Sequence, residues 1–198
     1  TNASYCFNSA FDNGEHTVYF KAENYSISTP IIMSDNDCLF GAGSAVHMGT
    51  GSILFAAAGF NDWIIKFSTS PPSSVNRGII LRDFGVNGNK EHQTTGGGIQ
   101  ANRRARCLFG HLMVRYCYTD GLILGDAGHL SYHNNVRDCH FMDNGGSGHE
   151  GAGLHIIYSE ENDIEGNLFT TNYNIYGALE VTSGTQRIIE NHFNEEYT

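Results

Sequence analysis

The side chains best suited to chemistry in this chain lie in and beside two long polar segments. The segments span residues 87–97 and 143–152 and carry lysine, histidine and carboxylate side chains. A short stretch between them, residues 115–120, adds two tyrosines and an aspartate. Paired carboxylates perform the acid–base chemistry of glycosidic-bond cleavage, and aromatic rings line many ligand sites. These residue types therefore suit a site for an extended carbohydrate chain.

The candidate residues divide by the role that each side chain could take. The candidate acid–base groups are Asp120, Asp143, Glu150 and His149. The candidate substrate-binding groups are Tyr116, Tyr118, His92, Lys90, His155 and Glu180. No spacing of histidine and carboxylate residues defines a metal site. The alternative interpretation is that both long segments are glycine-rich surface loops without a function.

Short strands must position these groups, because two strand phrases recur along the second half of the chain. One phrase places an apolar residue five positions before a phenylalanine, at residues 136–141, 164–169 and 188–193, with a looser copy at 79–84. The other places a small residue before an alternating strand, at residues 98–101, 121–124, 153–156 and 178–181. Two strands that recur in a fixed order form a coil, and stacked coils form a solenoid.

The second phrase predicts how the coils, or rungs, align. The equivalent residues are Ile99, Leu122, Leu154 and Leu179, which recur about every two dozen residues. The residues that follow them form an outward column of Gln100, Ile123, His155 and Glu180. This alignment makes His155 and Glu180 neighbours, roughly 4.8 Å apart at the backbone. Such a pair can transfer protons or form a surface ion pair of little energetic value.

The two long segments occupy the same place in the repeat, between the phenylalanine strand and the small-residue strand. We therefore expect both to leave the solenoid at one corner, two rungs apart. The short connection at residues 115–120 lies between them, which predicts two walls around a low floor.

Inward residues of a solenoid stack in columns along its axis. Asn167 and Asn191 fall at equivalent positions, with Cys139 in the preceding rung. We expect an asparagine column that satisfies backbone groups at a turn. The phenylalanines at 141, 169 and 193 predict a stacked core column in the same way.

Composition limits the classes of protein that this chain can belong to. Its 198 residues are enough for one domain, and the formal net charge of −10 argues against nucleic acid as a partner. The five cysteines are an odd number without CxxC spacing, so we expect small buried side chains rather than a disulfide framework. No apolar run is long enough to span a membrane.

The start of the chain carries a resemblance to a known family. The runs at residues 14–20 (GEHTVYF), 25–31 (YSISTPI) and 39–43 (LFGAG) resemble the opening of pectate-lyase-superfamily proteins. Lys21 and Glu23 replace the proline and glycine that are usual in that family. The resemblance implies an all-β fold, a single-stranded right-handed parallel β-helix with a short N-terminal capping helix. We expect one domain over residues 1–198, with the cap at 1–16, including a helix at 3–12, and stacked rungs at 17–198.

The catalytic signatures of this superfamily are absent from the chain. The Asp-Asp pair and the Arg-Ile-Lys of its glycoside hydrolases do not occur, and neither does the mannuronan-epimerase signature. The arginines at 103, 104 and 106 lack the clustered carboxylates of calcium-dependent pectate lyases. The fold also hosts unrelated activities, so no catalytic residue is carried over from the family.

Two functions remain open from the sequence. The first is a carbohydrate-active enzyme that cleaves an extracellular polysaccharide, either by hydrolysis without a cofactor or by β-elimination, for which a uronate substrate requires Ca²⁺ or cationic side chains. The second is a non-enzymatic structural or glycan-binding module of a tail spike, adhesin or extracellular assembly. An incomplete last rung exposes strand edges and predicts a homo-oligomer or larger assembly through the open end. Both functions imply an extracellular, virion or cell-surface location.

Overall fold

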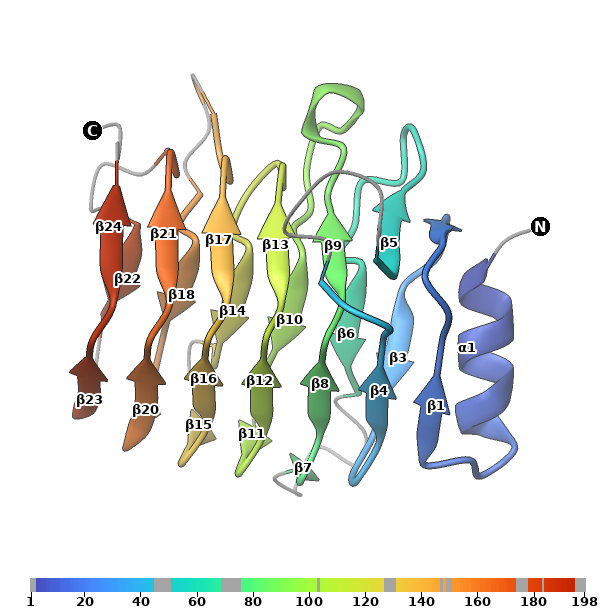
Figure 1. Ribbon diagram of the computed structural model, residues 1–198, viewed down its shortest axis with the longest axis horizontal. Helices are drawn as coiled ribbons and strands as arrows, with labels where there is room; N and C mark the ends of the chain where they lie inside the picture. The colour runs from blue at the N-terminus through green and yellow to red at the C-terminus, as the bar shows by residue number, and fades with distance from the viewer. Residues whose placement is uncertain are drawn as a thin grey trace.

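The computed structural model describes residues 3–44, 51–68, 76–102, 104–126, 131–146, 148, 151–173, 178–182 and 184–194. The chain winds into a parallel β-solenoid with one α-helix at its N-terminal end (Figure 1). The predicted parallel β-helix with an N-terminal helix is therefore confirmed. No helix in these residues has the length and apolar character to cross a membrane.

Helix α1 (Ala3–Asp12) has the bounds that the sequence predicts and covers the first rung. Its Phe7 is buried and packs edge-to-face on Phe20, with the ring centroids 5.4 Å apart. The Asn8 side chain accepts the Ile32 N–H at 2.9 Å and donates to the Pro30 carbonyl at 2.8 Å. The helix thus satisfies backbone groups that the first rung would otherwise leave unpaired.

Each turn of the coil except the last described one adds one strand to each of three long parallel sheets, and the middle rungs also add one to a fourth. Sheet A contains β1 (Thr17–Tyr19), β4 (Cys38–Phe40), β8 (Ile80–Arg82), β12 (Leu108–Gly110), β16 (Asn135–Arg137), β20 (Asn162–Glu165) and β23 (Gln186–Ile189). Sheet B contains β2 (Asn24–Ile27), β5 (Ile53–Ala56), β9 (Gly85–Asn87), β13 (Met113–Arg115), β17 (His140–Met142), β21 (Leu168–Thr170) and β24 (His192–Asn194). Sheet C contains β3 (Ile31–Met33), β6 (Ile65–Phe67), β10 (Ile99–Ala101), β14 (Leu122–Leu124), β18 (Leu154–Ile156) and β22 (Leu179–Val181). Sheet D contains β7 (Asn76–Arg77), β11 (Arg104–Ala105), β15 (Ser131–Tyr132) and β19 (Ser159–Glu160).

The predicted alignment of the rungs is confirmed where the repeat is strong. Ile99, Leu122, Leu154 and Leu179 pair in succession along sheet C. Phe141, Phe169 and Phe193 pair along sheet B, and their rings stack 5.2 and 4.9 Å apart. The core therefore consists of columns of identical or similar side chains that run along the axis.

The looser copy at residues 79–84 is out of register. Leu81, not Ile79, pairs with Phe109, and Val86 pairs with Val114 of the next rung. Phe84 therefore lies at a corner rather than in the phenylalanine column, and it packs on Phe20 at 5.3 Å. A buried phenylalanine fits either position, so residue type alone does not identify the column.

An asparagine column stabilises the corner between sheets A and B, as predicted. Asn167 accepts the N–H of Cys139 at 3.0 Å and donates to the Val136 carbonyl at 2.9 Å. Asn191 accepts the N–H of Asn167 and donates to Ile164 in the same way. A ladder of side-chain amides thus satisfies backbone groups at a buried turn.

Two further ladders occupy other corners. At the corner between sheets D and A, Asn134 accepts the Cys107 N–H and Asn162 accepts the N–H of Asn134. At the corner between sheets B and C, Asn144 accepts the Cys117 N–H and Asn172 accepts the Asn144 N–H. Every ladder begins at a buried cysteine. All five cysteines are free, but the expected burial holds only for these three, because Cys6 is exposed and Cys38 is partly buried. Burial raises the pKa of the Cys139 thiol to about 12, so it acts as a small apolar group.

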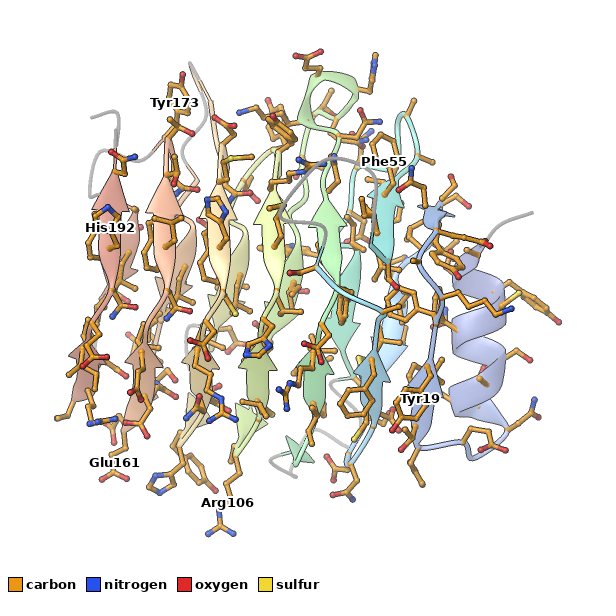
Figure 2. The ribbon with its side chains drawn as sticks, in the orientation of Figure 1. Tyr19, Phe55, Arg106, Glu161, Tyr173 and His192 are labelled. Atoms are coloured by element: carbon orange, nitrogen blue, oxygen red, sulfur yellow. The ribbon has the colours of Figure 1, made fainter. Side chains whose placement is uncertain are left out.

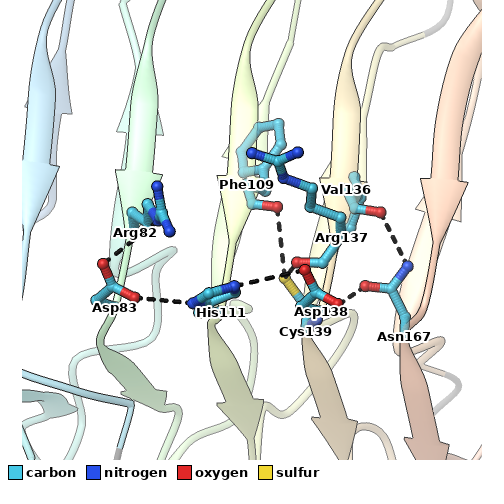
Figure 3. A network of polar contacts seen from close by, with 9 residues as sticks. All are labelled: Arg82, Asp83, Phe109, His111, Val136, Arg137, Asp138, Cys139 and Asn167. Atoms are coloured by element: carbon cyan, nitrogen blue, oxygen red, sulfur yellow. Dashed lines mark hydrogen bonds and ion pairs between the residues drawn. The ribbon is translucent and has the colours of Figure 1, made fainter.

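A row of charged side chains lines the outside of the corner between sheets A and B (Figure 3). His111 Nδ1 lies 3.1 Å from Asp83 Oδ1, and His111 Nε2 lies 3.4 Å from Asp138 Oδ2. All three residues have left-handed backbone angles, with φ between 50° and 62°. We call Asp83, His111 and Asp138 the corner cluster.

The core columns continue to the last described rung. Ile188 and Phe193 belong to columns that are buried in earlier rungs, yet they are 44% and 48% exposed. A hollow of about 620 Å³ borders Ile188 and is lined also by Leu179, Glu180, Val181 and Thr182. The described C-terminal rung therefore presents apolar core positions to solvent.

Candidate functional site

Three titratable side chains meet beside the outer face of sheet C. His155 Nδ1 lies 3.2 Å from Asp120 Oδ2, and His155 Nε2 lies 3.6 Å from Glu180 Oε2. The exposed fractions of the three side chains are 15% for Asp120, 18% for His155 and 17% for Glu180. We call these residues the sheet C cluster. A carboxylate on each side of an imidazole is an arrangement that can accept and deliver protons.

The repeat itself brings the three side chains together. His155 and Glu180 are the central residues of β18 and β22, and they pair in register, as predicted for the outward column. Asp120 lies in the connection from sheet B to sheet C, two residues before β14 begins. Its carboxylate reaches forward by one rung to His155. The outward column was thus predicted correctly, but the link from Asp120 to His155 was not.

Asp120 is held in place through both carboxylate oxygens. The Ala152 N–H donates to Asp120 Oδ1 at 2.7 Å, and Oδ2 faces His155 Nδ1. The Oδ2 oxygen beside Nδ1 accepts a hydrogen bond from that nitrogen, which fixes the imidazole tautomer and its orientation.

The surroundings raise the pKa of His155 above its ordinary value. Burial alone lowers the pKa of this imidazole, but the hydrogen bond and charge of Asp120, together with the charge of Glu180, outweigh it. Nε2 is buried and has no hydrogen-bond partner. The ring therefore holds its proton more firmly than a free histidine does, and Nε2 is positioned beside Glu180 without a hydrogen bond.

The corner between sheets B and C contains the other predicted candidates. Lys90, in the 3₁₀ turn η1 (Lys90–His92), extends over the short connection of the next rung. Its Nζ donates to the carbonyls of Asp143 and Gly145 at 2.7 and 2.8 Å. Nζ also lies 6.0 Å from the ring centroid of Tyr116 and 5.3 Å from that of Tyr173.

Lys90 therefore joins the two predicted walls instead of lining an open floor between them. Burial lowers the pKa of this ammonium group, and the charge of Asp143 opposes the effect. The carbonyl contacts stabilise the charged form, because carbonyl oxygens accept hydrogen bonds from it. The conformation of the first long segment determines this contact, and spacing along the chain does not reveal it.

The remaining predicted site residues lie in different surroundings. Asp143 Oδ1 accepts the Thr171 hydroxyl at 2.6 Å rather than facing His155. His92 is exposed in η1, and Tyr118 is partly buried in the connection before β14. His149 and Glu150 lie outside the described residues. The structure thus brings Asp120, His155 and Glu180 together, and Lys90 meets Tyr116 separately.

A pocket of about 250 Å³ lies on the sheet B side of the same corner. Its lining residues are Phe55, Asn87, Asn89, Lys90, Glu91 and Tyr116. Figure 2 shows Phe55 and Tyr173 along the edge of the solenoid where these connections leave it. The corner therefore carries two polar surfaces, this pocket and the sheet C cluster. In the described part of the chain, no group of three or more histidine, cysteine, aspartate or glutamate side chains is arranged to hold a metal ion.

Comparison with known proteins places the chain among solved solenoids. No protein-family model matches it, and no curated protein matches it. A candidate glycosyl hydrolase from Parabacteroides merdae is 11% identical, with a TM-score of 0.65, and the match covers 99% of this chain and 88% of that one. Geobacillus virus E2 ORF18 is 16% identical, with a TM-score of 0.62, and the match covers 90% and 34% of the two chains. The A-module of mannuronan C-5 epimerase AlgE4 from Azotobacter vinelandii is 14% identical, with a TM-score of 0.58, and the match covers 85% and 48%.

These likenesses show the fold. Sequence identity is too low to show a shared activity, because one fold hosts many chemistries. The chain spans about a third of the length of the viral protein and about half of the epimerase module. It is a parallel β-helix whose structural neighbours include a viral protein, a polysaccharide epimerase and a candidate glycosyl hydrolase.

Proposed function

We propose that this chain is a carbohydrate-active member of the pectate-lyase superfamily that cleaves an extracellular polysaccharide. The proposal assigns Asp120, His155 and Glu180 as its acid–base centre. One observation carries it: an imidazole with a raised pKa lies between two carboxylates, and all three side chains are largely buried. Perturbed titratable groups of this kind are concentrated at functional sites.

The proposed reaction is hydrolysis of a glycosidic bond. His155 donates its Nε2 proton to the glycosidic oxygen as the bond from that oxygen to the anomeric carbon breaks. A water molecule attacks the anomeric carbon and gives a proton to the Glu180 carboxylate. Asp120 holds the imidazole and stabilises its charged form. Glu180 Oε2 lies 3.6 Å from the buried Nε2, closer than the roughly 6.5–9.5 Å that separate acid and base when water attacks the opposite face of the sugar. The Glu180 side chain must therefore rotate away to admit the glycan and the water.

The charges of the cluster favour hydrolysis over β-elimination. β-Elimination acts next to a sugar carboxylate, and Asp120 and Glu180 repel a uronate unit at this position. A raised pKa also favours the protonated form of His155, which suits an acid better than a base. Hydrolysis proceeds without a cofactor, whereas the lyase alternative requires Ca²⁺ or another cation to neutralise the substrate.

The proposal includes the setting of the protein. The chain acts as one β-helix domain at the extracellular or virion surface, with a polysaccharide as its partner. The polysaccharide epimerase and the candidate glycosyl hydrolase among its structural neighbours support this class of substrate at the level of the fold.

A second candidate function is a non-enzymatic glycan-binding or structural module of a spike, adhesin or extracellular assembly. The observation that favours it is the apolar last described rung, where Ile188 and Phe193 are about half exposed. Such a surface can stack on further rungs or on a second copy. The viral neighbour fits this function as well as it fits the first.

The test measures turnover on a panel of neutral and uronate polysaccharides, with and without Ca²⁺. New reducing ends report any cleavage, and ultraviolet absorbance of unsaturated products reports β-elimination. We expect reducing ends without unsaturated products from a neutral polysaccharide, and loss of this activity in Asp120→Asn, His155→Gln and Glu180→Gln. His111→Gln, in the chemically similar corner cluster, is the matched control. A folded chain that cleaves nothing, or variants that keep full activity, would contradict the proposal.

A further inference from the structure

The chain contains a single tryptophan, Trp63, and its surroundings are unusual. Trp63 ends the connection from sheet B to sheet C two residues before β6 and is partly exposed. The rung that follows presents three consecutive buried glycines, Gly96, Gly97 and Gly98, at this position. The indole ring therefore lies on a stretch of bare backbone.

Gly97 packs against both the Trp63 ring and the backbone of Asp120, a residue of the sheet C cluster. A Cβ atom at Gly97 would lie 2.7 Å from Trp63 Cη2 and 2.6 Å from the Asp120 carbonyl oxygen. Any side chain at residue 97 would thus displace the indole or the backbone of Asp120. The backbone ladder is continuous here, because the Ile64 N–H donates to Gly97 O and the Gly98 N–H donates to Asp120 O. Trp63 lies two rungs before Asp120, roughly 10 Å along the axis.

Polar groups extend from the tryptophan to the proposed acid–base centre. The Asp62 carboxylate accepts the backbone N–H of Trp63 at 2.8 Å and pairs with Lys66 Nζ at 2.7 Å. Lys66 pairs in register with Gln100 on the outer face of sheet C. The same outward column continues to His155 and Glu180. The outward column therefore runs from Lys66 and Gln100 through the apolar Ile123 to His155 and Glu180, and Trp63 lies three residues before Lys66 at the corner where sheet C begins.

We propose that Trp63 is the stacking platform of a glycan-binding subsite that lies N-terminal to the acid–base centre. An indole ring packs on the apolar face of a pyranose, and the neighbouring Lys66 and Gln100 offer hydrogen bonds to hydroxyl groups. The subsite rests on the proposed function, because it takes the same chain that Asp120, His155 and Glu180 would cleave. The glycan would run along the solenoid axis rather than across it.

The single tryptophan makes the subsite directly observable. Excited at a wavelength that the ten tyrosines do not absorb, the protein fluoresces only from Trp63, so binding is measured without relying on turnover. The probes are oligosaccharides of glucose, mannose, galactose, xylose and galacturonate. They are titrated into the Asp120→Asn variant so that none is cleaved. We expect a saturable shift of the emission with at least one neutral oligosaccharide.

Calorimetry then compares affinities among variants. Trp63→Ala should weaken binding at least about tenfold, the size of loss expected when an aromatic anchor is truncated. Trp63→Phe should recover part of the affinity, because a smaller ring still stacks. Phe55→Ala, in the pocket on the sheet B side of the corner, is the matched aromatic control and should bind normally.

The outcomes separate this inference from the proposed function. Cleavage of a polysaccharide without any response of Trp63, or with unchanged binding in Trp63→Ala, would overturn the subsite and leave the enzyme intact. Binding at Trp63 without turnover by the native chain would support the subsite and refute the enzyme. Loss of affinity in Phe55→Ala alone would place the glycan in the pocket that Phe55 lines on the sheet B side of the corner. No binding of any probe, together with no cleavage by the native chain, would overturn both.

Discussion

The corner cluster and the sheet C cluster contain the same chemical groups, an imidazole between two carboxylates, in different surroundings. In the corner cluster the side chains of Asp83, His111 and Asp138 are 37%, 45% and 58% exposed. In the sheet C cluster none of the three exceeds 18%. Water screens charges in the first cluster, whereas the partly buried groups of the second interact more strongly. Burial, rather than residue type, distinguishes a candidate site from a surface row.

Backbone conformation explains this difference in burial. The corner residues adopt left-handed angles at the outer edge of three successive turns, which directs their side chains away from the body of the solenoid (Figure 3). His155 and Glu180 instead project from the middle of paired strands. Asp120 is held down by the Ala152 N–H. Position within the rung therefore sets how much solvent each cluster meets.

The largest contrast should appear in catalysis. His155→Gln should lower the turnover of a cleaved polysaccharide by about 10²- to 10⁴-fold, the usual contribution of a general acid. His111→Gln should leave turnover unchanged, because its cluster lies at a different corner. Equal losses in the two variants, with both proteins folded, would show that neither histidine acts directly. The measurement is initial rate against substrate concentration.

A smaller contrast should appear in stability. Asp120→Ala leaves the Ala152 N–H and the His155 ring without their partner in a largely buried place, which should cost about 1–3 kcal/mol of unfolding free energy. Asp83→Asn removes an exposed ion pair, keeps a residue type that tolerates the left-handed backbone angle at this position, and should cost less than about 1 kcal/mol. Urea denaturation followed by circular dichroism measures both values. A larger loss for Asp83→Asn would reverse the comparison.

The titration of His155 sharpens the comparison further. Its pKa is raised in the folded protein, so its contribution to stability is fully present below the unfolded pKa of about 6.5 and is lost as the pH rises through the folded pKa. Asp120→Asn should lower the pKa of His155, because the effect of burial then lacks its main opposing charge. An NMR titration of the imidazole protons checks the direction. A pKa that stays the same in the variant would mean that Asp120 is not the controlling charge.

The smallest expected effect concerns salt. The cost of His111→Gln in unfolding free energy should be under about 1 kcal/mol and should shrink as ionic strength rises, because exposed ion pairs are screened. The cost of His155→Gln should change less over the same range. Paired denaturation curves at low and high NaCl concentration make the comparison. A cost of His111→Gln that does not depend on salt would indicate a packing role for that ring.

Sequence patterns predicted the parts of the fold that depend on repetition. The sheet C column was aligned correctly because each rung marks it with a small residue before an alternating strand. The copy at residues 79–84 was misaligned because Phe84 is buried at a corner, where a phenylalanine resembles one in the core column. The ladders through Asn134 and Asn144 were missed because no aromatic residue marks their turns. An asparagine recurring at the end of successive strands was the available signal.

The candidate site was predicted only in pieces. His155 and Glu180 were aligned by the repeat, and Asp120 was named as a floor residue. Their meeting depends on a side chain that reaches forward by one rung, which a column of equivalent positions does not reveal. The bridge from Lys90 to the carbonyl of Asp143 depends on the conformation of an irregular segment. No periodic pattern encodes that conformation.

The asparagine ladders have a direction along the solenoid axis, because each side-chain oxygen in them accepts a hydrogen bond from the rung before its own. Asn144, Asn167 and Asn191 each accept an N–H and donate to a carbonyl in the rung before their own. A rung therefore has its turns completed by its successor. Because synthesis releases the N-terminal part first, a coil whose turn carries such a ladder gains its full set of hydrogen bonds only after the next coil has been made.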